Sequence, residues 1–367
     1  MASDDIRVLV VDDSAVIRAM LVDQLATAPG MAIAGIARNG REALAALTAL
    51  RPDVITLDVQ MPEMDGLAVV DAILASDPIP VIMVSSLTRA GAAVTLDALD
   101  RGAIDYVAKP DGGAGGMATF VAELIQKIRN AAGIDVRRVL ARRKSRAAAR
   151  EAAQSLPTAK APADTYPKEF ADRCVALGVS TGGPPALTRL LEALRPPMPP
   201  MVIVQHMPPQ FTGPLAARLD SLSALSVREA VHGDRLQPNC VLVAPGGKHL
   251  ELRGSRTRAS VILRDGPVVS GHKPSVDVMM TGAARIFGPN CLGVVMTGMG
   301  RDGADGCRAI RAAGGFVLGQ DAASSDVYGM NRVAYVEGNV DQQFGLPEAA
   351  AMISRQVRRL GRATVPA

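Results

Sequence analysis

Ser180 stands among small residues at the end of an apolar run, in the segment Gly178-Val-Ser-Thr-Gly182. The run predicts a buried strand, and the Gly-x-Ser-x-Gly spacing is typical of a nucleophile on a sharp turn from strand to helix. A serine hydroxyl attacks a carbonyl efficiently only when a histidine takes its proton and an acid orients that histidine. The alternative interpretation is a glycine-rich turn whose backbone N–H groups hold an anion at the start of a helix.

Candidates for the base and the acid follow two other apolar runs. His206 comes directly after residues 201–205, and Asp302 lies in the loop after residues 291–297. Because the carboxyl ends of parallel strands meet at one edge of a sheet, we expect Ser180, His206 and Asp302 to form a catalytic triad. Their order along the chain differs from the Ser, Asp, His order of α/β-hydrolases, so we predict a different doubly wound sheet.

Other side chains could take over these roles. His272 is the reserve candidate for the base. Asp277 could replace Asp302 as the acid, but it begins an apolar helical pattern, so a helix N-cap is the simpler interpretation. His232 and His249 lie near polar turns, and we predict that they are surface or structural residues.

Three aspartates near the N-terminus predict a second site. Asp12 and Asp13 follow the apolar run 6–11, and Asp58 ends the run 54–58. These positions are ends of predicted parallel strands, so the three carboxylates should meet in one pocket. Clustered carboxylates repel one another unless a cation separates them, and Mg²⁺, which prefers oxygen ligands, is the expected cation.

Ser85 and Lys109 each follow a further strand-like run and complete this predicted site. A metal, a carboxylate nucleophile, a hydroxyl and a lysine are the groups that phosphoryl transfer to an aspartate would use. Residues 5 to about 130 resemble the response-regulator receiver domain. The motifs that carry the resemblance are Asp12-Asp13, Leu57-Asp58-Val-Gln-Met-Pro-Glu-Met-Asp-Gly66, Ser85 and Lys109-Pro110, in this order.

The receiver resemblance implies a role for each of these residues. Asp58 would be the phosphoacceptor, and Mg²⁺ would be held by Asp12, Asp13, Asp58 and the carbonyl of Gln60. The resemblance also implies that the phosphate is sensed by Ser85, Tyr106 and Lys109, and that a sensor histidine kinase is the phosphodonor.

Strand-like runs alternate with helical stretches in both halves of the chain, so we predict an α/β fold. Five runs in the N-terminal part predict a (βα)5 doubly wound receiver domain: 6–11, 31–37, 54–58, 80–85 and 104–108. Six runs in the C-terminal part predict a doubly wound, mainly parallel α/β domain: 174–179, 201–205, 240–244, 260–264, 291–297 and 316–319.

A basic segment separates the two predicted domains. Residues 137–160 hold eight basic side chains and one acidic side chain, Glu151, and a stretch rich in proline and alanine overlaps and follows them. Such a composition predicts a linker over residues 131–169. The whole chain carries a net charge of +4, so the remainder is slightly acidic, which argues against nucleic-acid binding.

Hydropathy and cysteine spacing narrow the class of protein further. No apolar run approaches the roughly 18 residues that a membrane span requires, and the acidic N-terminus is unlike a signal peptide. We therefore expect a cytoplasmic protein that is not inserted in a membrane. The four cysteines show no Cys-x-x-Cys spacing, so we expect buried free thiols rather than zinc ligands or disulfides.

The segment from about residue 172 to the end resembles the chemotaxis protein-glutamate methylesterase family, whose members are also protein-glutamine glutaminases. Five motifs carry the resemblance: Gly178-Val-Ser-Thr-Gly-Gly-Pro184, Gln205-His-Met-Pro-Pro209, Ala244-Pro-Gly-Gly-Lys-His249, Pro274-Ser-Val-Asp277 and Thr297-Gly-Met-Gly-Arg-Asp-Gly303. The prediction is then a receiver domain over 1–130, the linker over 131–169 and a methylesterase catalytic domain over 170–367.

This second resemblance implies a phosphorylation-activated hydrolase that acts on methyl-accepting chemoreceptors. Ser180 would attack a glutamate γ-methyl ester, His206 would be base and then acid, and Asp302 would orient His206; certain glutamines would be deamidated. The oxyanion would be bound by the backbone amides of Met299 and Thr181. We expect no cofactor for ester hydrolysis, and a monomer. The alternative function is a receiver fused to a DNA-binding module, a non-catalytic adaptor or a phosphate sink.

Overall fold

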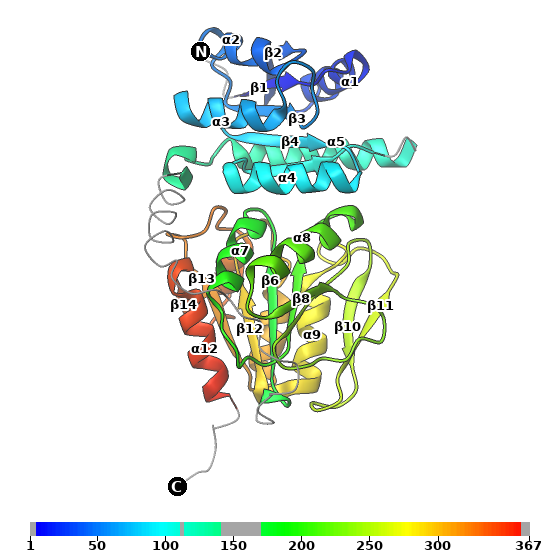
Figure 1. Ribbon diagram of the computed structural model, residues 1–367, viewed down its shortest axis with the longest axis vertical. Coiled ribbons are helices and arrows are strands. Elements are labelled where there is room, and N and C mark those ends of the chain that lie inside the picture. Colours follow the sequence, from blue (N-terminus) through cyan, green and yellow to red (C-terminus); the bar gives the residue numbers. More distant parts are fainter. Residues whose placement is uncertain (1–4, 111–113, 141–169, 361–367) are drawn as a thin grey trace. The chain divides into compact units, whose positions relative to one another are not determined.

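The computed structural model describes residues 5–110, 114–140 and 170–360. The chain divides into two compact units, residues 1–154 and 155–367 (Figure 1). Residues 141–169, which make up most of the predicted linker 131–169, lie outside the described residues. Within the described residues, no helix is long and apolar enough to cross a membrane.

The first unit is a five-stranded sheet in the order β2-β1-β3-β4-β5, and all its neighbouring strands pair in parallel. Helix α1 packs against α5, while α2, α3 and α4 pack in succession. The elements are β1 (Ile6–Val11), α1 (Ala15–Ala26), β2 (Met31–Ala37), α2 (Gly40–Leu50), β3 (Val54–Asp58), α3 (Gly66–Ser76), β4 (Val81–Ser85), α4 (Arg89–Arg101), β5 (Asp105–Ala108) and α5 (Ala114–Ala131).

Local sequence explains where these helices begin. Ser14, Asn39, Asp65 and Thr88 each accept a hydrogen bond from the backbone N–H three residues later, which satisfies a donor that the first helical turn leaves unpaired. Each cap follows the carboxyl end of a strand. The connections between strand and helix, which carry the polar residues, therefore gather at one edge of the sheet.

The second unit contains a seven-stranded sheet and a separate two-stranded hairpin. The sheet order is β14-β13-β12-β6-β7-β9-β8, and all its pairs are parallel. Its strands are β6 (Cys174–Val179), β7 (Met201–Gln205), β8 (Ser226–Glu229), β9 (Cys240–Val243), β12 (Cys291–Val295), β13 (Phe316–Gln320) and β14 (Gln342–Phe344). The hairpin pairs β10 (His249–Arg253) with β11 (Ser260–Arg264) in antiparallel orientation.

Helices cover the sheet of the second unit in two groups: α7 packs against α8 and α12, and α10 packs against α9 and α11. They are α7 (Gly183–Ala193), α8 (Pro209–Leu222), α9 (Val276–Phe287), α10 (Ala304–Ala312), α11 (Met330–Val336) and α12 (Ala349–Arg359), with short 3₁₀ turns at Gly288–Asn290 and Leu346–Glu348. The predicted doubly wound, mainly parallel fold class is confirmed.

Four strands differ from the sequence-based prediction. β8, β10 and β14 were not predicted, and the run 260–264 forms β11 of the hairpin rather than a strand of the main sheet. β8 and β14 are short edge strands with polar residues, so they lack the continuous apolar run that marks a buried parallel strand. β10 and β11 are each only partly buried, and they pair with each other rather than with a strand of the main sheet.

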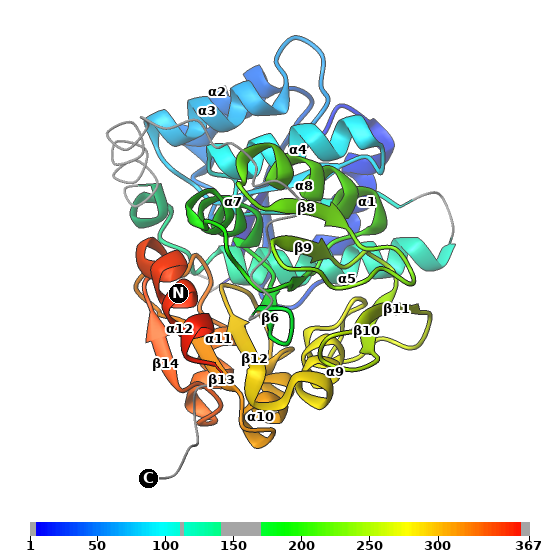
Figure 2. The ribbon, with the colours of Figure 1, turned by 60° about the horizontal axis from the view of Figure 1, so that its bottom comes forward.

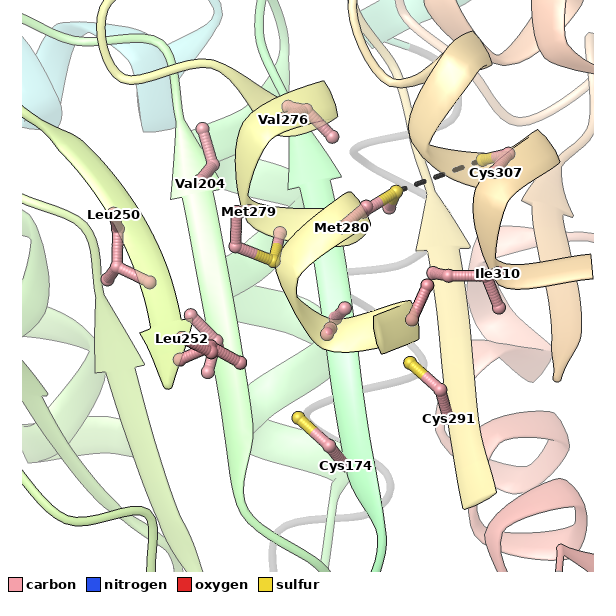
Figure 3. Packing of buried hydrophobic residues seen from close by; sticks show 14 of the residues in the cluster. Cys174, Val204, Leu250, Leu252, Val276, Met279, Met280, Cys291, Cys307 and Ile310 are labelled. Atoms are coloured by element: carbon pink, nitrogen blue, oxygen red, sulfur yellow. Dashed lines mark hydrogen bonds between the residues drawn. The ribbon is translucent and has the colours of Figure 1, made fainter. Parts of the chain in front are cut away.

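The core under the predicted triad is aliphatic and rich in sulfur. Met279 and Met280 of α9 lie over the central strands, which carry Cys174 and Cys291 (Figure 3). All four cysteines are free, and three of them are buried, in agreement with the expectation of free thiols. Flexible methionine side chains fill irregular gaps between helix and sheet. This packing fixes the N-terminus of α9 against the carboxyl end of the sheet.

Candidate active site and phosphorylation site

Ser180 lies on a tight turn between β6 and α7. The strand ends at Val179, and α7 begins at Gly183 after Gly182, which adopts a left-handed φ of 74°. A side chain on Gly182 would approach Asp326 within 2.7 Å. Only glycine therefore suits this position, for both conformational and steric reasons. The turn places Ser180 at the carboxyl end of the central strand.

β6 is the point where the connections of the sheet change direction. The chain leaves β6 toward β7 on one side and leaves β12 toward β13 on the other, and β6 and β12 lie side by side in both views (Figure 1 and Figure 2). The carboxyl ends of strands at such a switch point form the usual ligand crevice of an open α/β sheet. Ser180 and the loop that carries Asp302 both lie at this crevice.

His206 follows the neighbouring strand β7, and Gln205 ties it to the nucleophile turn. Val179 and Gln205 are register partners, and the His206 amide donates to the Val179 carbonyl at 3.3 Å. The Gln205 side chain donates to the carbonyls of Ser180 and His206, each at 3.1 Å. Gln205 is not among the predicted site residues; its signal in the sequence is a polar side chain at the end of an apolar run, and in the structure it is 2% exposed.

Asp302 and His206 form the predicted contact between acid and base. His206 Nε2 lies 2.8 Å from Asp302 Oδ2, and the Asp302 side chain is completely buried. Because an ionised carboxylate only accepts, Nε2 carries the proton, which leaves the Nδ1 lone pair of neutral His206 to act as base.

Nδ1 is buried and has no hydrogen-bond partner among the described residues, so the Ser180 hydroxyl does not contact it here. Such catalytic hydrogen bonds often tighten only when substrate binds.

The N-terminus of α9 holds Asp302 in place. Asp302 Oδ2 also accepts from the Val276 amide at 2.7 Å, and its Oδ1 accepts from the Asp277 amide at 3.0 Å and the Ser275 hydroxyl at 2.8 Å. Four donors thus surround the two carboxylate oxygens, and the positive end of the helix favours a negative charge there. These α9 donors are not part of the sequence-based prediction, and their signal in the sequence is the motif Pro274-Ser-Val-Asp277.

Asp277 in turn binds the N-terminus of α10, the helix that follows Asp302. Its Oδ1 accepts from the amides of Gly303 and Gly306, each at 2.8 Å, at the start of α10. The expectation that Asp277 is an N-cap of its own helix is wrong, because Ser275 caps α9 and Asp277 lies in the first turn. Asp277 and Asp302 therefore each bind the N-terminus of the other's helix.

The two carboxylates have opposite pKa shifts. Burial alone would raise the pKa of Asp302, but hydrogen bonds from His206 and from the α9 amides outweigh it and lower the pKa to about 2. Burial, helped by the nearby Asp302 charge, raises the pKa of Asp277 above its ordinary value. Asp302 is thus ionised throughout the range in which an imidazole can act as a base.

The lowered pKa of Asp302 predicts a pH-dependent contribution to stability. A carboxylate with a folded-state pKa of about 2, against about 3.9 when unfolded, adds about 2 kcal/mol at pH 5. This contribution is present above the unfolded pKa and is lost as the pH falls through 2. We expect the free energy of unfolding of the Asp302→Asn variant to approach that of the unmodified chain between pH 5 and pH 2, as measured by urea titrations. A constant difference across this range would contradict the shift.

The predicted oxyanion donors flank Ser180. A Cβ on Gly298 would lie 2.8 Å from the Ser180 Cβ, so the backbone before Met299 passes directly against the nucleophile. The Met299 amide donates to none of the described residues. Thr181 follows Ser180, and its carbonyl accepts from the Thr297 hydroxyl at 2.9 Å. The Thr297 amide in turn donates to the buried Gln320 side chain at 2.9 Å, which fixes this loop.

The remaining histidines have distinct surroundings. His272, the reserve base, stacks on His206 with ring centroids 3.7 Å apart and an angle of 8° between the ring planes. His249 is buried, with Nε2 at 2.8 Å from the Pro267 carbonyl and Nδ1 accepting from the Ser275 amide, which is a structural role. His232 is exposed and accepts from the Leu263 amide.

The aspartates of the first unit meet at the carboxyl ends of β1 and β3. Asp12, Asp13 and Asp58 each offer a carboxylate oxygen within 4.8 Å of the others. Lys109 Nζ lies 2.8 Å from an oxygen of Asp12 and 2.8 Å from an oxygen of Asp58. The oxygen-only donor set fits a magnesium ion, and the lysine stands where it would face a phosphoryl group on Asp58.

The pKa values of Asp58 and Lys109 are both raised. Burial raises the pKa of Asp58, although the hydrogen bond from Lys109 opposes it. Burial would lower the pKa of Lys109, but its bonds to Asp12 and Asp58 prevail and raise it. The ammonium group therefore stays charged in the pocket.

The other predicted receiver residues surround the same edge of the sheet. Ser85 is buried at the end of β4, and the Lys109 amide donates to its carbonyl at 2.7 Å. The Gln60 amide lies 3.5 Å from Asp58 Oδ1. Tyr106 is buried on β5, where burial raises its pKa, and the Lys127 ammonium lies 4.9 Å from its ring centroid.

Comparison with known proteins extends over nearly the whole chain. It is 44% identical over 361 residues to protein-glutamate methylesterase/protein-glutamine glutaminase 4 of Anaeromyxobacter dehalogenans, covering 97% of this chain and 96% of the relative. It is 43% identical over 357 residues to protein-glutamate methylesterase/protein-glutamine glutaminase 2 of Pseudomonas aeruginosa, covering 97% of this chain and 98% of that relative. The crystal structure of the Thermotoga maritima CheB methylesterase catalytic domain is 34% identical, with a TM-score of 0.48, and covers 51% of this chain and 97% of that one.

A receiver-type cluster of carboxylates and a Ser–His–Asp arrangement on separate parallel sheets define a response regulator with a hydrolase as its output unit. Residues 8–114 match the family model of the response regulator receiver domain, and residues 175–353 match that of the CheB methylesterase. The chain belongs to the protein-glutamate methylesterase/protein-glutamine glutaminase family.

Proposed function

We propose that Ser180, His206 and Asp302 are the catalytic residues with which this chain hydrolyses glutamate γ-methyl esters on methyl-accepting chemoreceptors, and that it deamidates certain receptor glutamines at the same site. The observation that carries the proposal is the 2.8 Å contact between His206 and the buried Asp302, one strand away from the Ser180 turn. The names of the relatives support the reaction class.

The protonation state of His206 determines the order of events. His206 Nδ1 takes the proton of the Ser180 hydroxyl as the serine oxygen attacks the ester carbonyl carbon, and Nε2–H stays bonded to Asp302. The carbonyl becomes a tetrahedral oxyanion. Nδ1–H then protonates the methoxy oxygen, so that methanol leaves and an acyl-serine remains. Water attacks the acyl group by the same route, giving glutamate and free serine.

A glutamine side chain follows the same steps, with ammonia leaving in place of methanol. The oxyanion is bound by the amides of Met299 and Thr181, which adjoin the nucleophile in space or in sequence. The ionised Asp302 stabilises the imidazolium that each proton transfer creates, and its low pKa keeps it from taking the proton itself.

Ester hydrolysis by this route requires no cofactor. His206, His272 and Asp302 each offer a ligand atom within 4.8 Å of the others. The two rings are nearly parallel, so their nitrogen lone pairs lie in separate planes, and both Asp302 oxygens already accept two hydrogen bonds. A tetrahedral metal site would need converging lone pairs, so this geometry supports a triad.

The first unit receives the phosphoryl group on Asp58. A chemotaxis sensor histidine kinase is the proposed donor, and Mg²⁺ would be held by Asp12, Asp13, Asp58 and the Gln60 carbonyl. When bound, the ion neutralises phosphate oxygens during transfer. Lys109 pairs with the phosphate, while Ser85 and Tyr106 sense it.

Three further expectations belong to the proposal. The receiver domain spans 1–130, the linker 131–169 and the catalytic domain 170–367. The protein acts as a monomer in the cytoplasm, and it binds no nucleic acid. The net positive charge comes from the segment 137–160, which leaves the remainder of the chain slightly acidic.

One experiment distinguishes the proposed esterase from the competing function, a receiver joined to a non-catalytic binding or phosphate-sink module. The protein is incubated with methylated receptor-bearing membranes, and methanol release is measured before and after treatment with a serine-directed fluorophosphonate. We expect methanol release that rises when a small phosphodonor is added and that stops in proportion to labelling of Ser180, located by peptide mass spectrometry. Absence of methanol release from phosphorylated protein would favour the non-catalytic module.

A further inference from the structure

His272 covers one face of the proposed base. Its ring lies 3.7 Å from that of His206, at an angle of 8°. Among the described residues, the His206 side chain is hydrogen-bonded at one edge only, through Nε2 to Asp302. A bond at a single edge leaves rotation of the ring plane only partly restrained. A second ring stacked on its face restrains rotation of the His206 ring out of the plane in which Nε2 meets Asp302.

The loop that carries His272 is itself held firmly. Val269 and His272 exchange two backbone hydrogen bonds of 3.1 and 3.0 Å across Ser270 and Gly271, which both have positive φ angles. This is the pattern of a tight two-residue turn, and the non-glycine residue at positive φ marks local strain that its surroundings must compensate. The Ser270 hydroxyl donates to Asp277 Oδ2 at 2.9 Å, which anchors the turn on the first turn of α9.

The orientation of the His272 ring is fixed as well. His272 Nδ1 lies 2.9 Å from the Ser270 carbonyl, and because a carbonyl only accepts, Nδ1 carries a proton. Asp277 thus supports both partners of His206: it anchors the turn under His272 and binds the α10 amides that follow Asp302. The base is held at its edge by Asp302 and on its face by His272.

We propose that His272 is a positioning residue for the catalytic base, whose stacked ring holds His206 in the plane in which Nε2 meets Asp302 and Nδ1 is left to accept the Ser180 proton. The inference rests on the proposed function, in which His206 is the base. His272 thus acts through His206 and does not itself take part in the proton transfers.

The test separates the ring from the hydrogen bond in the full-length protein. His272→Phe keeps a ring face but loses the donor to Ser270, whereas His272→Asn keeps an N–H donor but loses the ring. His272→Ala loses both, and His232→Ala is the control for an exposed histidine. We measure kcat and KM for methanol release from methylated receptor membranes, the rate of Ser180 labelling by a fluorophosphonate, and the melting temperature of each variant.

We expect His272→Ala and His272→Asn to lower kcat and the labelling rate by roughly ten- to a hundredfold with KM nearly unchanged, because a small misplacement of a catalytic group has effects of this size. His272→Phe should recover most of the lost rate. Rescue by Asn and not by Phe, or a change in KM alone, would overturn the inference in favour of a loop-anchoring role. An unchanged kcat in His272→Ala would also overturn it. If His206→Ala stayed active while His272→Ala did not, the proposed base itself would be wrong.

Discussion

Ser180→Ala and His206→Ala should each lower methanol release from methylated receptors by about four to six orders of magnitude, because members of a triad act as a unit. Without the serine there is no acyl intermediate. Without His206, the serine proton loses its proposed acceptor, the buried Nδ1, which makes no hydrogen bond with the described residues. The measurement is the initial rate of methanol release at a fixed receptor concentration.

Asp302→Asn should be less damaging than either variant, because the acid orients and stabilises the base and does not react. The substitution replaces one acceptor oxygen by a donor, next to donors from Ser275, Val276 and Asp277, so it also perturbs the N-terminus of α9. His232→Ala serves as the histidine control and should keep the unmodified rate. An Asp302→Asn variant slower than Ser180→Ala would show that Asp302 does more than orient His206.

Asp58→Asn should reduce phosphorylation by a small phosphodonor to background while basal methanol release continues. Asp58 is one of two buried carboxylates that Lys109 contacts at 2.8 Å, and its amide counterpart cannot form an acyl phosphate by the same attack. The esterase residues all come from the other unit, which has its own hydrophobic core. Incorporated phosphate and methanol release are measured on the same samples.

Two controls accompany this comparison. Asp23→Asn changes an exposed carboxylate near the end of α1 and should leave phosphorylation intact. Chelation of Mg²⁺ should block phosphorylation and spare basal hydrolysis, because only the aspartate cluster is proposed to need the ion. Label incorporated into the Asp58→Asn protein, or basal hydrolysis lost on chelation, would contradict the division of labour between the two units.

The sequence alone was sufficient for the fold class and for the candidate residues at strand ends. Buried parallel strands are continuous apolar runs, and in an α/β sheet the residues after them gather at one edge. Ser180, His206 and Asp302 could therefore be proposed as one site, and Asp12, Asp13 and Asp58 as another. The structure places each set at the carboxyl ends of neighbouring strands.

The apolar runs did not predict the edge strands β8 and β14 or the hairpin of β10 and β11. β8 and β14 are short and partly polar, because an edge strand buries only part of its surface. The run that forms β11 contains three consecutive apolar residues, Val261-Ile-Leu263, as strands of the main sheet do. Its pairing with β10 in a separate hairpin is decided by the chain between the two strands and by packing against α9.

Only the tertiary structure decided which atoms meet. No spacing in the sequence indicates that His206 contacts Asp302 through Nε2, that Asp277 binds the amides of α10, or that His272 stacks on His206. Apolar periodicity reports which face of an element is buried, and it carries no information about side-chain torsions or about which helix N-terminus lies opposite a carboxylate. Those contacts depend on how α9 and α10 pack against each other, because that packing fixes the directions in which their first-turn amides point.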